Sequence, residues 1–391
     1  MRRAWIYAVL CSMTGACAGL LGVDDVSYGP EGPASEAGAE GAPFDGAGDS
    51  TGDGEPCSTD LSRDPEHCGS CTRRCGDGRT CADGLCAPEL VLSGLSSPNT
   101  VLRVAGTTLV STGDGVFRCA ATGCGDAGEP LLLANAAANE IVTGFAADDA
   151  GMTVGVLTLL GVGIPAGRVV SCPLGACASP RVLAPSEENL QTVARSDVDV
   201  LWGRDSVVNE ELVSCPAGSC DGGSVQLGKT PSGPESVTGI APRGASILWM
   251  VGARLYETHR GGGTTLIAAI GTASARQPFV RDGDRVYWGN AEARLVEQCD
   301  VSSSCDGTRA LFVPAGGTPR ALAVDSSHLY VAVDSPPTDG GSIGFVGRAP
   351  RTANAKIEVL AKAKAGLRAI TVDAAHVYWA EDNGMVWRVA K

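Results

Sequence analysis

The sequence predicts an all-β fold, a seven-bladed β-propeller built from four-stranded blades. Three observations lead to this prediction. An apolar and aromatic phrase returns about every 45 residues from Leu109 to the C-terminus, a spacing typical of repeat architectures. Each copy contains short runs of alternating polarity, as strands do. The last copy stops before its fourth run, and a matching run precedes the first copy.

The repeat is clearest near the C-terminus, where segments 370–373, 377–379 and 384–388 read Ile-Thr-Val-Asp, Val-Tyr-Trp and Gly-Met-Val-Trp-Arg. Corresponding positions of the phrase fall at Leu109, Val154, Val200, Ile247, Val286, Leu329 and Val377. The β-branched and aromatic runs favour strands, and the Gly, Asp, Ser and Pro residues between them favour turns. Four strands in a unit of this length are typical of a propeller blade.

The two ends of the repeat region predict that the ring closes. The final unit ends at Lys391 after its third strand, and segment 89–94, Glu-Leu-Val-Leu-Ser-Gly, resembles the fourth strands expected at 181–184 and 359–361. Pairing the first segment with the last blade would leave no open sheet edge. We therefore assign the propeller to residues 89–391. An irregular pair of β-sandwiches and a β-solenoid are the alternatives.

Residues 1–17 predict export. Arg2 and Arg3 precede an apolar stretch that ends near Ala16, which is too short to span a bilayer but has the charge and length of a secretory signal. The segment Thr14-Gly15-Ala16-Cys17 resembles a bacterial lipobox, although leucine is usual where Thr14 stands. This resemblance implies that Cys17 is the lipidated first residue of a protein anchored to the outer membrane or cell surface.

Two further features bear on the N-terminus. The alternative to lipidation is cleavage at Ala16-Cys17-Ala18 as an A-x-A site, which would give a soluble secreted protein. Residues 18–56 are acidic and rich in Gly, Ala and Pro, with few apolar side chains, so we expect a disordered linker that would suit a tether to a lipid anchor.

The cysteine count agrees with export. The chain has 16 cysteines, and 14 remain when Cys11 and Cys17 are set aside, an even number that suits an oxidising compartment. Eight of them form short-range pairs that follow third-strand phrases: Cys119 with Cys124, Cys172 with Cys177, Cys215 with Cys220, and Cys299 with Cys305. We expect disulfides that pin the turn between third and fourth strands. A redox or metal site is the alternative, but four copies scattered around a ring do not converge on one point.

The other six cysteines, within residues 57–88, predict a separate disulfide-rich module: Cys57, Cys68, Cys71, Cys75, Cys81 and Cys86. Six cysteines allow 15 connectivities, so spacing leaves the pairing open. Zinc is the alternative, because Cys68 and Cys71 have ligand spacing and His67 is adjacent. The segments 64–71 and 78–81 resemble the stigma-specific cysteine-rich motif, which implies an extracellular module without catalytic residues.

Composition limits the partners. The net charge is −14 and the pI is about 4.8. Nucleic-acid binding needs a basic surface, and docking on anionic lipids needs a basic patch, so we expect neither. Membrane attachment would come from the lipid anchor alone, and we expect a monomer.

The repeat phrases at 286–290 and 377–381, Val-Tyr-Trp-Gly-Asn and Val-Tyr-Trp-Ala-Glu, resemble YWTD and NHL-type propeller repeats. The resemblance covers residues 89–391 and implies a binding or scaffold propeller, so we expect non-enzymatic binding of a protein or glycan through the propeller loops. No catalytic motif is found, and we expect no catalytic residue, cofactor or metal. A lyase-like or quinoprotein-like enzyme acting in the central channel, and a purely structural envelope component, are the alternatives. The chain has four histidines: His67, His259, His328 and His376.

Overall fold

The computed structural model describes residues 60–391 except 72, 77, 120–123, 125–127, 136–137, 160–164, 176, 207–208, 218–219, 221–222, 232–235, 271–276, 304, 306–309, 315, 336–342 and 353. The expected signal peptide with Cys17, the expected linker at 18–56, and Cys57 lie outside the described residues. Within the described part, no helix is long and apolar enough to cross a membrane.

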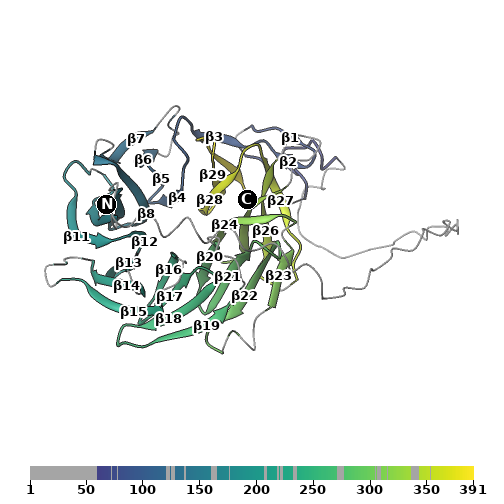
Figure 1. Ribbon diagram of the computed structural model, residues 1–391. Coiled ribbons are helices and arrows are strands. Elements are labelled where there is room, and N and C mark those ends of the chain that lie inside the picture. The colour runs from purple at the N-terminus through teal and green to yellow at the C-terminus, as the bar shows by residue number, and fades with distance from the viewer. Residues whose placement is uncertain are drawn as a thin grey trace, which may run out of the picture. The chain divides into compact units, whose positions relative to one another are not determined.

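Seven four-stranded antiparallel sheets form the blades of a ring, which confirms the predicted fold class (Figure 1). The strands of blades 1 to 3 are β4 (Thr100–Val104), β5 (Thr107–Thr112), β6 (Gly115–Cys119), β7 (Glu129–Leu133); β8 (Glu140–Asp148), β9 (Gly151–Thr158), β10 (Ala166–Cys172), β11 (Arg181–Glu188); and β12 (Leu190–Arg195), β13 (Asp199–Asp205), β14 (Asn209–Pro216), β15 (Val225–Pro231). Those of blades 4 and 5 are β16 (Val237–Arg243), β17 (Ser246–Val251), β18 (Arg254–His259), β19 (Thr264–Ala269); and β20 (Phe279–Asp282), β21 (Arg285–Asn290), β22 (Leu295–Asp300), β23 (Ala310–Pro314). Those of blades 6 and 7 are β24 (Thr318–Val324), β25 (His328–Asp334), β26 (Gly344–Pro350), β27 (Glu358–Ala363); and β28 (Leu367–Val372), β29 (His376–Glu381), β30 (Val386–Ala390) with β3 (Glu89–Leu92).

The ring closes through the predicted pairing of its first and last segments. Strand β3 is the fourth strand of blade 7 and pairs with β30, with Leu90 opposite Trp387. Arg388 donates a hydrogen bond to Glu89 across this seam at 2.9 Å. The strand is shorter than the expected segment 89–94, because the chain turns at Gly94, whose φ is 77°.

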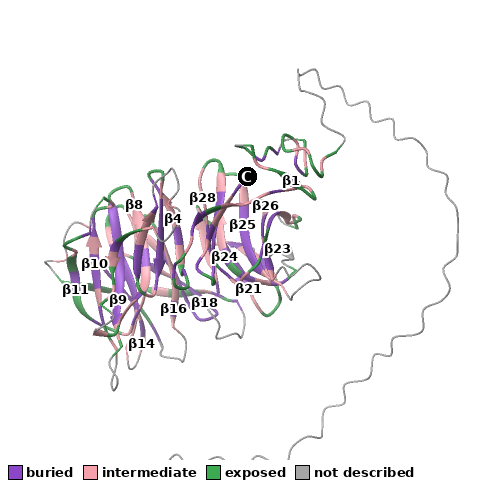
Figure 2. Cartoon of the chain, turned by 90° about the horizontal axis from the view of Figure 1, so that it is seen from above, coloured by how far each residue is buried: buried purple, intermediate pink, exposed green. Residues whose placement is uncertain are grey.

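The core lies between the blades, and the second strands are its most buried part (Figure 2). The tryptophans that recur in these strands, Trp202, Trp249, Trp288 and Trp379, are 0–1% exposed. A large indole in a strand that is covered on both faces buries much apolar area, so these side chains make up a large part of the core.

Disulfides close the connection between third and fourth strands in blades 1, 2, 3 and 5. The bonds join Cys119 to Cys124, Cys172 to Cys177, Cys215 to Cys220 and Cys299 to Cys305. Each pair brackets the start of an outer hairpin, where the spacing had placed it. A bond across so short a loop stabilises by about 2 kcal/mol on the loop-entropy estimate.

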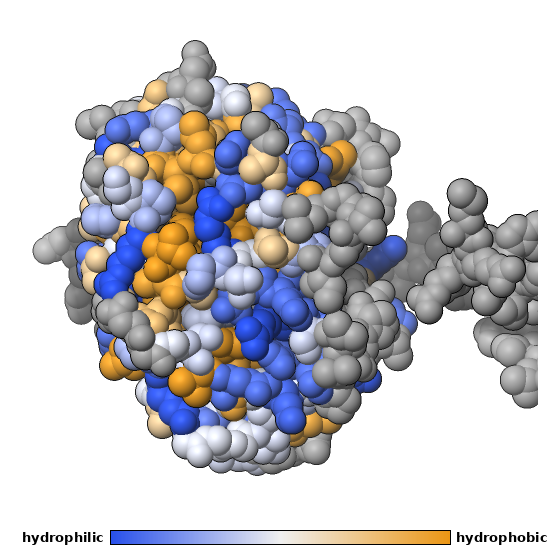
Figure 3. Space-filling view, turned by 60° about the vertical axis from the view of Figure 1, so that its left-hand side comes forward, coloured by the Kyte–Doolittle hydropathy of each residue, from blue (hydrophilic) through white to orange (hydrophobic). Residues whose placement is uncertain are grey.

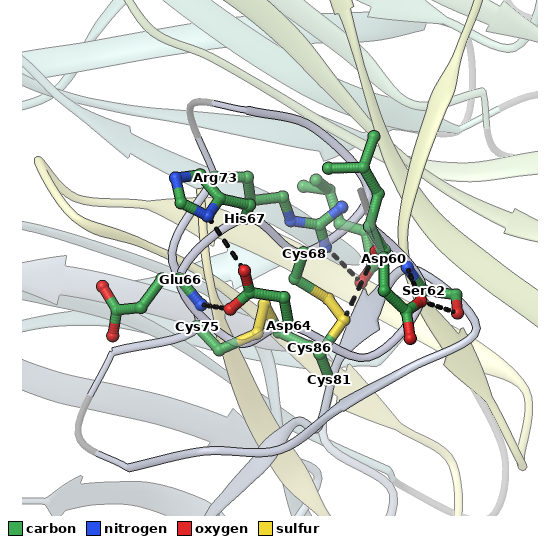
Figure 4. The surroundings of a disulfide bond; sticks show 12 residues. Asp60, Ser62, Asp64, Glu66, His67, Cys68, Arg73, Cys75, Cys81 and Cys86 are labelled. Carbon is green, nitrogen blue, oxygen red and sulfur yellow. Dashed lines mark hydrogen bonds and ion pairs between the residues drawn. A yellow bond between two sulfur atoms is a disulfide. The ribbon is translucent and has the colours of Figure 1, made fainter. Parts of the chain in front are cut away.

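The cysteine-rich module contains a small hairpin, β1 (Cys81–Ala82) and β2 (Leu85–Cys86). Cys68 is bonded to Cys81 and Cys75 to Cys86 (Figure 4). Cys71 is also disulfide-bonded. The zinc alternative therefore fails at Cys68 and Cys71, since a bonded sulfur is not a thiolate ligand. His67 instead faces Asp64, with Nδ1 3.0 Å from the carboxylate (Figure 4).

The module packs against blades 6 and 7. Its cysteines share one buried cluster with Trp379 and Leu360. Arg73, only 2% exposed, donates to the backbone carbonyl of Leu360 at 3.0 Å and pairs with Glu358. Because β27 is the outer strand of blade 6, the Arg73 guanidinium satisfies a backbone carbonyl at a sheet edge that would otherwise face solvent.

Candidate functional site: the central channel and the two faces of the ring

The connections between strands divide the ring into two faces. We call the face that carries the connections from first to second and from third to fourth strands the disulfide face, since all four hairpin disulfides lie there. The opposite face carries the connections from second to third strands and those between blades.

Ion pairs join neighbouring blades at the disulfide face. Six blade junctions have such a pair: Arg103–Asp373, Arg195–Asp148, Arg260–Asp199, Arg243–Asp284, Arg351–Asp282 and Lys391–Asp325. At the junction of blades 1 and 2, Arg118 donates to the carbonyl of Gly175 at 3.0 Å. Most charged groups of this face are therefore engaged in holding blades together.

The hairpin turn Asp282-Gly283-Asp284 belongs to this set. Gly283 has a φ of 61°, a left-handed conformation that suits the tight turn. The two flanking aspartates pair with arginines of blades 6 and 4. Turn formation and blade contacts thus account for these carboxylates.

An identical polar cluster recurs in blades 6 and 7. In blade 7 the Asp373 carboxylate accepts the backbone N–H of His376 and the hydroxyl of Tyr378, each at 2.8 Å. In blade 6 the Asp325 carboxylate accepts the same two groups from His328 and Tyr330, again at 2.8 Å. His328 and His376 therefore have equivalent roles in the turns before their second strands.

Charge in these clusters is set by hydrogen bonding. Burial would raise the pKa of Asp325, but hydrogen bonds from Lys391, the Ser327 and His328 amides and Tyr330 lower that pKa well below its usual value. The pKa of Asp373 is lowered in the same way, although burial opposes the shift. The pKa of Tyr378 is raised, first by burial and then by its hydrogen bond to Asp373, so the phenol remains a donor.

The central channel is lined by the first strands of all seven blades and has a volume of about 580 Å³. Its cations are Arg281, Arg320 and Arg368. Among the described residues that line it there is no aspartate, glutamate or histidine. The charged side chains that line the channel are therefore all arginines, and two of them pair with carboxylates outside the lining, Asp334 and Asp382.

A bulge in the inner strands places polar side chains at the channel. The register shifts opposite the second strand at Thr238 in β16, at Arg320 in β24 and at Arg368 in β28. A bulged residue leaves the pairing pattern, and a bulge can re-aim its side chain. All three of these residues line the channel.

The channel arginines differ in their surroundings. Arg320 lies 2.7 Å from Asp334 and Arg368 lies 4.0 Å from Asp382, and both arginine side chains are about half exposed. Exposed pairs of this kind contribute at most about 1 kcal/mol, so both guanidinium groups can exchange partners. Arg281 donates to the carbonyls of Ala241 and Gly283, and its pKa is lowered by burial and by the neighbouring Arg243.

The four histidines lie away from the channel lining. His67 is in the module, His259 ends the third strand of blade 4, and His328 and His376 begin second strands at the disulfide face. The sequence reasoning identified no channel residue, because the repeat phrase records buried positions and the bulged residues vary between blades. The only signal was the equivalence of Arg320 and Arg368, each five residues before the aspartate of its turn.

The outer strands also carry exposed apolar side chains. Leu133 in β7, Val182 in β11, Val225 in β15 and Leu266 in β19 are each 49–60% exposed. Figure 3 shows apolar side chains gathered on one side of the ring beside hydrophilic ones. These positions lie at the rim rather than at the channel.

These features define a closed seven-bladed propeller with an arginine-lined channel and a docked disulfide module. No known protein family matches the chain, and no curated protein matches its sequence. Solved propellers are similar in fold. A chain of a mitotic checkpoint complex structure shares 13% identity at a TM-score of 0.55, covering 81% of this chain and 99% of that one.

Two further structures show the same likeness. Virginiamycin B lyase from Staphylococcus aureus is 10% identical with a TM-score of 0.54, over 78% of this chain and 98% of the lyase. The WD40 propeller domain of Doa1 is 11% identical with a TM-score of 0.52, over 78% and 97% of the two chains. Such low identities establish the fold alone, since propellers host unrelated functions.

Proposed function

We propose that this chain is an exported, non-enzymatic binding propeller that engages an acidic group of a protein or glycan at the channel mouth on the face opposite the disulfides. The observation that carries the proposal is the channel lining, which has three arginines and, among its described residues, no carboxylate. Arg320 and Arg368 lie on neighbouring blades at equivalent bulges. A carboxylate that replaced Asp334 and Asp382 as their partner would gain charge-assisted hydrogen bonds.

The division of the ring into two faces supports this choice. Ion pairs and disulfides occupy the disulfide face, whereas the two channel arginines of the opposite face, Arg320 and Arg368, are themselves about half exposed. Propeller loops on a rigid scaffold are suitable binding elements.

The lining also favours binding over an enzyme. The lyase neighbour was solved as a catalytically inactive histidine-to-alanine variant, so that enzyme depends on an imidazole. The described channel lining of this chain offers neither an imidazole nor a carboxylate for general acid–base chemistry.

The test is capture of partners from envelope and culture-medium extracts with the purified full chain, read by mass spectrometry and by glycan analysis. The comparison is with an Arg320→Ala/Arg368→Ala variant. A matched control, Arg181→Ala/Lys356→Ala, removes the same charge from exposed sites on the disulfide face. We expect an acidic partner to be retained by the chain and the control and lost by the channel variant. Equal recovery by all three proteins would contradict the proposal.

Attachment to a membrane is a second part of the proposal. The lipobox-like Thr14–Cys17 motif supports lipidation at Cys17, and the many disulfides suit an oxidising compartment. We expect Cys17→Ser to release the protein from the membrane fraction. If that variant stays in the membrane fraction, Cys17 is not the anchor. The secreted alternative would also lose support, because a secreted protein would be soluble.

A further inference from the structure

A second cavity, separate from the channel, lies where the module meets blades 6 and 7. It has a volume of about 600 Å³. Its apolar walls include Leu85 and Pro88 from the module side and Trp379, Met385 and Trp387 from blade 7. A cavity of this size with aromatic walls, at the junction of two structural units, is typical of small-molecule sites.

The walls are held in place by contacts that do not require a ligand. The bond between Cys75 and Cys86 fixes β2, which borders the cavity. Arg73 ties the module to β27 through the Leu360 carbonyl. The Glu381 carboxylate, 3% exposed, accepts from the Trp379 indole at 3.3 Å and from the Asn383 amide at 3.2 Å. The cavity is therefore preformed.

Charge is distributed unevenly at the cavity. Lys362 and Lys364 border the cavity and are exposed. They are two residues apart at the end of β27, so both side chains point to the same face of the strand. Within the described part of the chain, neither lysine has an ion-pair partner. Of the two acids that border the cavity, Glu381 is already occupied by two donors, and Asp83 sits in the hairpin turn of the module with a φ of 53°.

From this arrangement we propose that the cavity binds a small, flat apolar molecule carrying one anionic group. The ring of Trp387 and the Met385 side chain, both partly exposed, receive the apolar body, since aromatic and thioether side chains pack well against flat ligands. The two lysines receive the anion at the rim. This site does not depend on the channel arginines, so each proposal can fail without the other.

The test uses two fluorescent probes on the full, disulfide-bonded chain. Anilinonaphthalene sulfonate is a flat apolar body with one anionic group, and N-phenyl-naphthylamine is a similar body without the charge. We expect saturable binding of the sulfonate at one site and weaker binding of the uncharged probe. Equal affinity for the two probes would overturn the assignment of the lysines.

Variants locate the probe. Ala82→Trp places a large side chain at the exposed rim of the cavity, and Ala245→Trp makes the same change at an exposed turn of blade 4. We expect Ala82→Trp to weaken sulfonate binding by about tenfold or more and Ala245→Trp to leave it unchanged. Lys362→Ala/Lys364→Ala should weaken it by about two- to fivefold with little effect on the uncharged probe.

Two outcomes would overturn the proposal. One is unchanged sulfonate affinity in Ala82→Trp when that variant has the thermal unfolding midpoint of the parent. The other is equal loss of affinity in Ala82→Trp and Ala245→Trp, which would show that the probe binds exposed apolar surface in general.

Discussion

Asp373 and Tyr378 show at the residue scale how a short repeated phrase acquires a structural role. The aspartate that ends the first strand caps the turn and accepts the hydroxyl of the tyrosine five residues later. Arg103 of blade 1 then pairs with the aspartate and lies 4.9 Å from the tyrosine ring centroid. The Asp373 side chain thus connects a turn, the second strand of blade 7 and the neighbouring blade 1.

Loss of the hydroxyl should therefore be measurable. We expect Tyr378→Phe to lower the free energy of unfolding by about 1.5 kcal/mol, because it leaves a charged acceptor without its buried donor. Tyr330→Phe should cost a similar amount, since its geometry is the same. Urea unfolding of the three proteins checks this, and a midpoint unchanged in both variants would show that the hydroxyls contribute nothing.

The lowered pKa values of Asp325 and Asp373 also predict an acid response. In the folded state both carboxylates bind protons less readily than in the unfolded state. Their contribution is therefore fully present above about pH 4, the ordinary pKa of aspartate, and is lost as the pH falls below it.

Asp325→Asn tests this response. The variant should be less stable than the parent at pH 7 and should lose less stability between about pH 4 and pH 2. Unfolding midpoints measured across this range check the prediction. Parallel pH curves for the variant and the parent would contradict it.

At the scale of elements, the strands were largely predictable and the docking of the module was not. Local alternation of apolar residues marks each strand, and the cysteine spacing placed each disulfide after a third strand. The contact between Arg73 and the Leu360 carbonyl joins residues 287 apart in the chain, and no local pattern records such a partner. The same holds for the cavity between the module and blade 7.

Arg73 provides the test of this docking. We expect Arg73→Met to lower the free energy of unfolding by about 2 kcal/mol, because a charged hydrogen bond to a buried carbonyl is lost. The amides of β27 should also exchange faster with solvent, since this edge loses its cover. Hydrogen exchange read by mass spectrometry measures both the edge and a reference strand such as β17. Exchange that is unchanged in β27 would mean that the module protects it without the arginine.

The channel shows another limit of prediction at this scale. The bulges in β24 and β28 decide that Arg320 and Arg368 line the channel. A bulge is a departure from the regular alternation, so a pattern based on alternation cannot locate it.

For the whole molecule, ring closure is the feature on which stability should depend most. The closing strand could be predicted from the sequence, because the last repeat contains three of the four strands of a blade and segment 89–94 supplies a fourth. We expect a chain truncated after Met385, which lacks β30, to lose cooperative unfolding and to associate, since β3 would lose the strand it pairs with and β29 one of its two neighbours. Size-exclusion chromatography and thermal unfolding check this. A monomeric truncated chain with one sharp transition would show that the other blades suffice.

The seam between β3 and β30 also links folding to the order of synthesis. Glu89 of β3 and its partner Arg388 of β30 are 299 residues apart in the chain, so the ring cannot close until β30 has been made. A polypeptide that stops before β30 keeps β3 without the strand it pairs with, and proteases and chaperones can recognise such an unpaired edge.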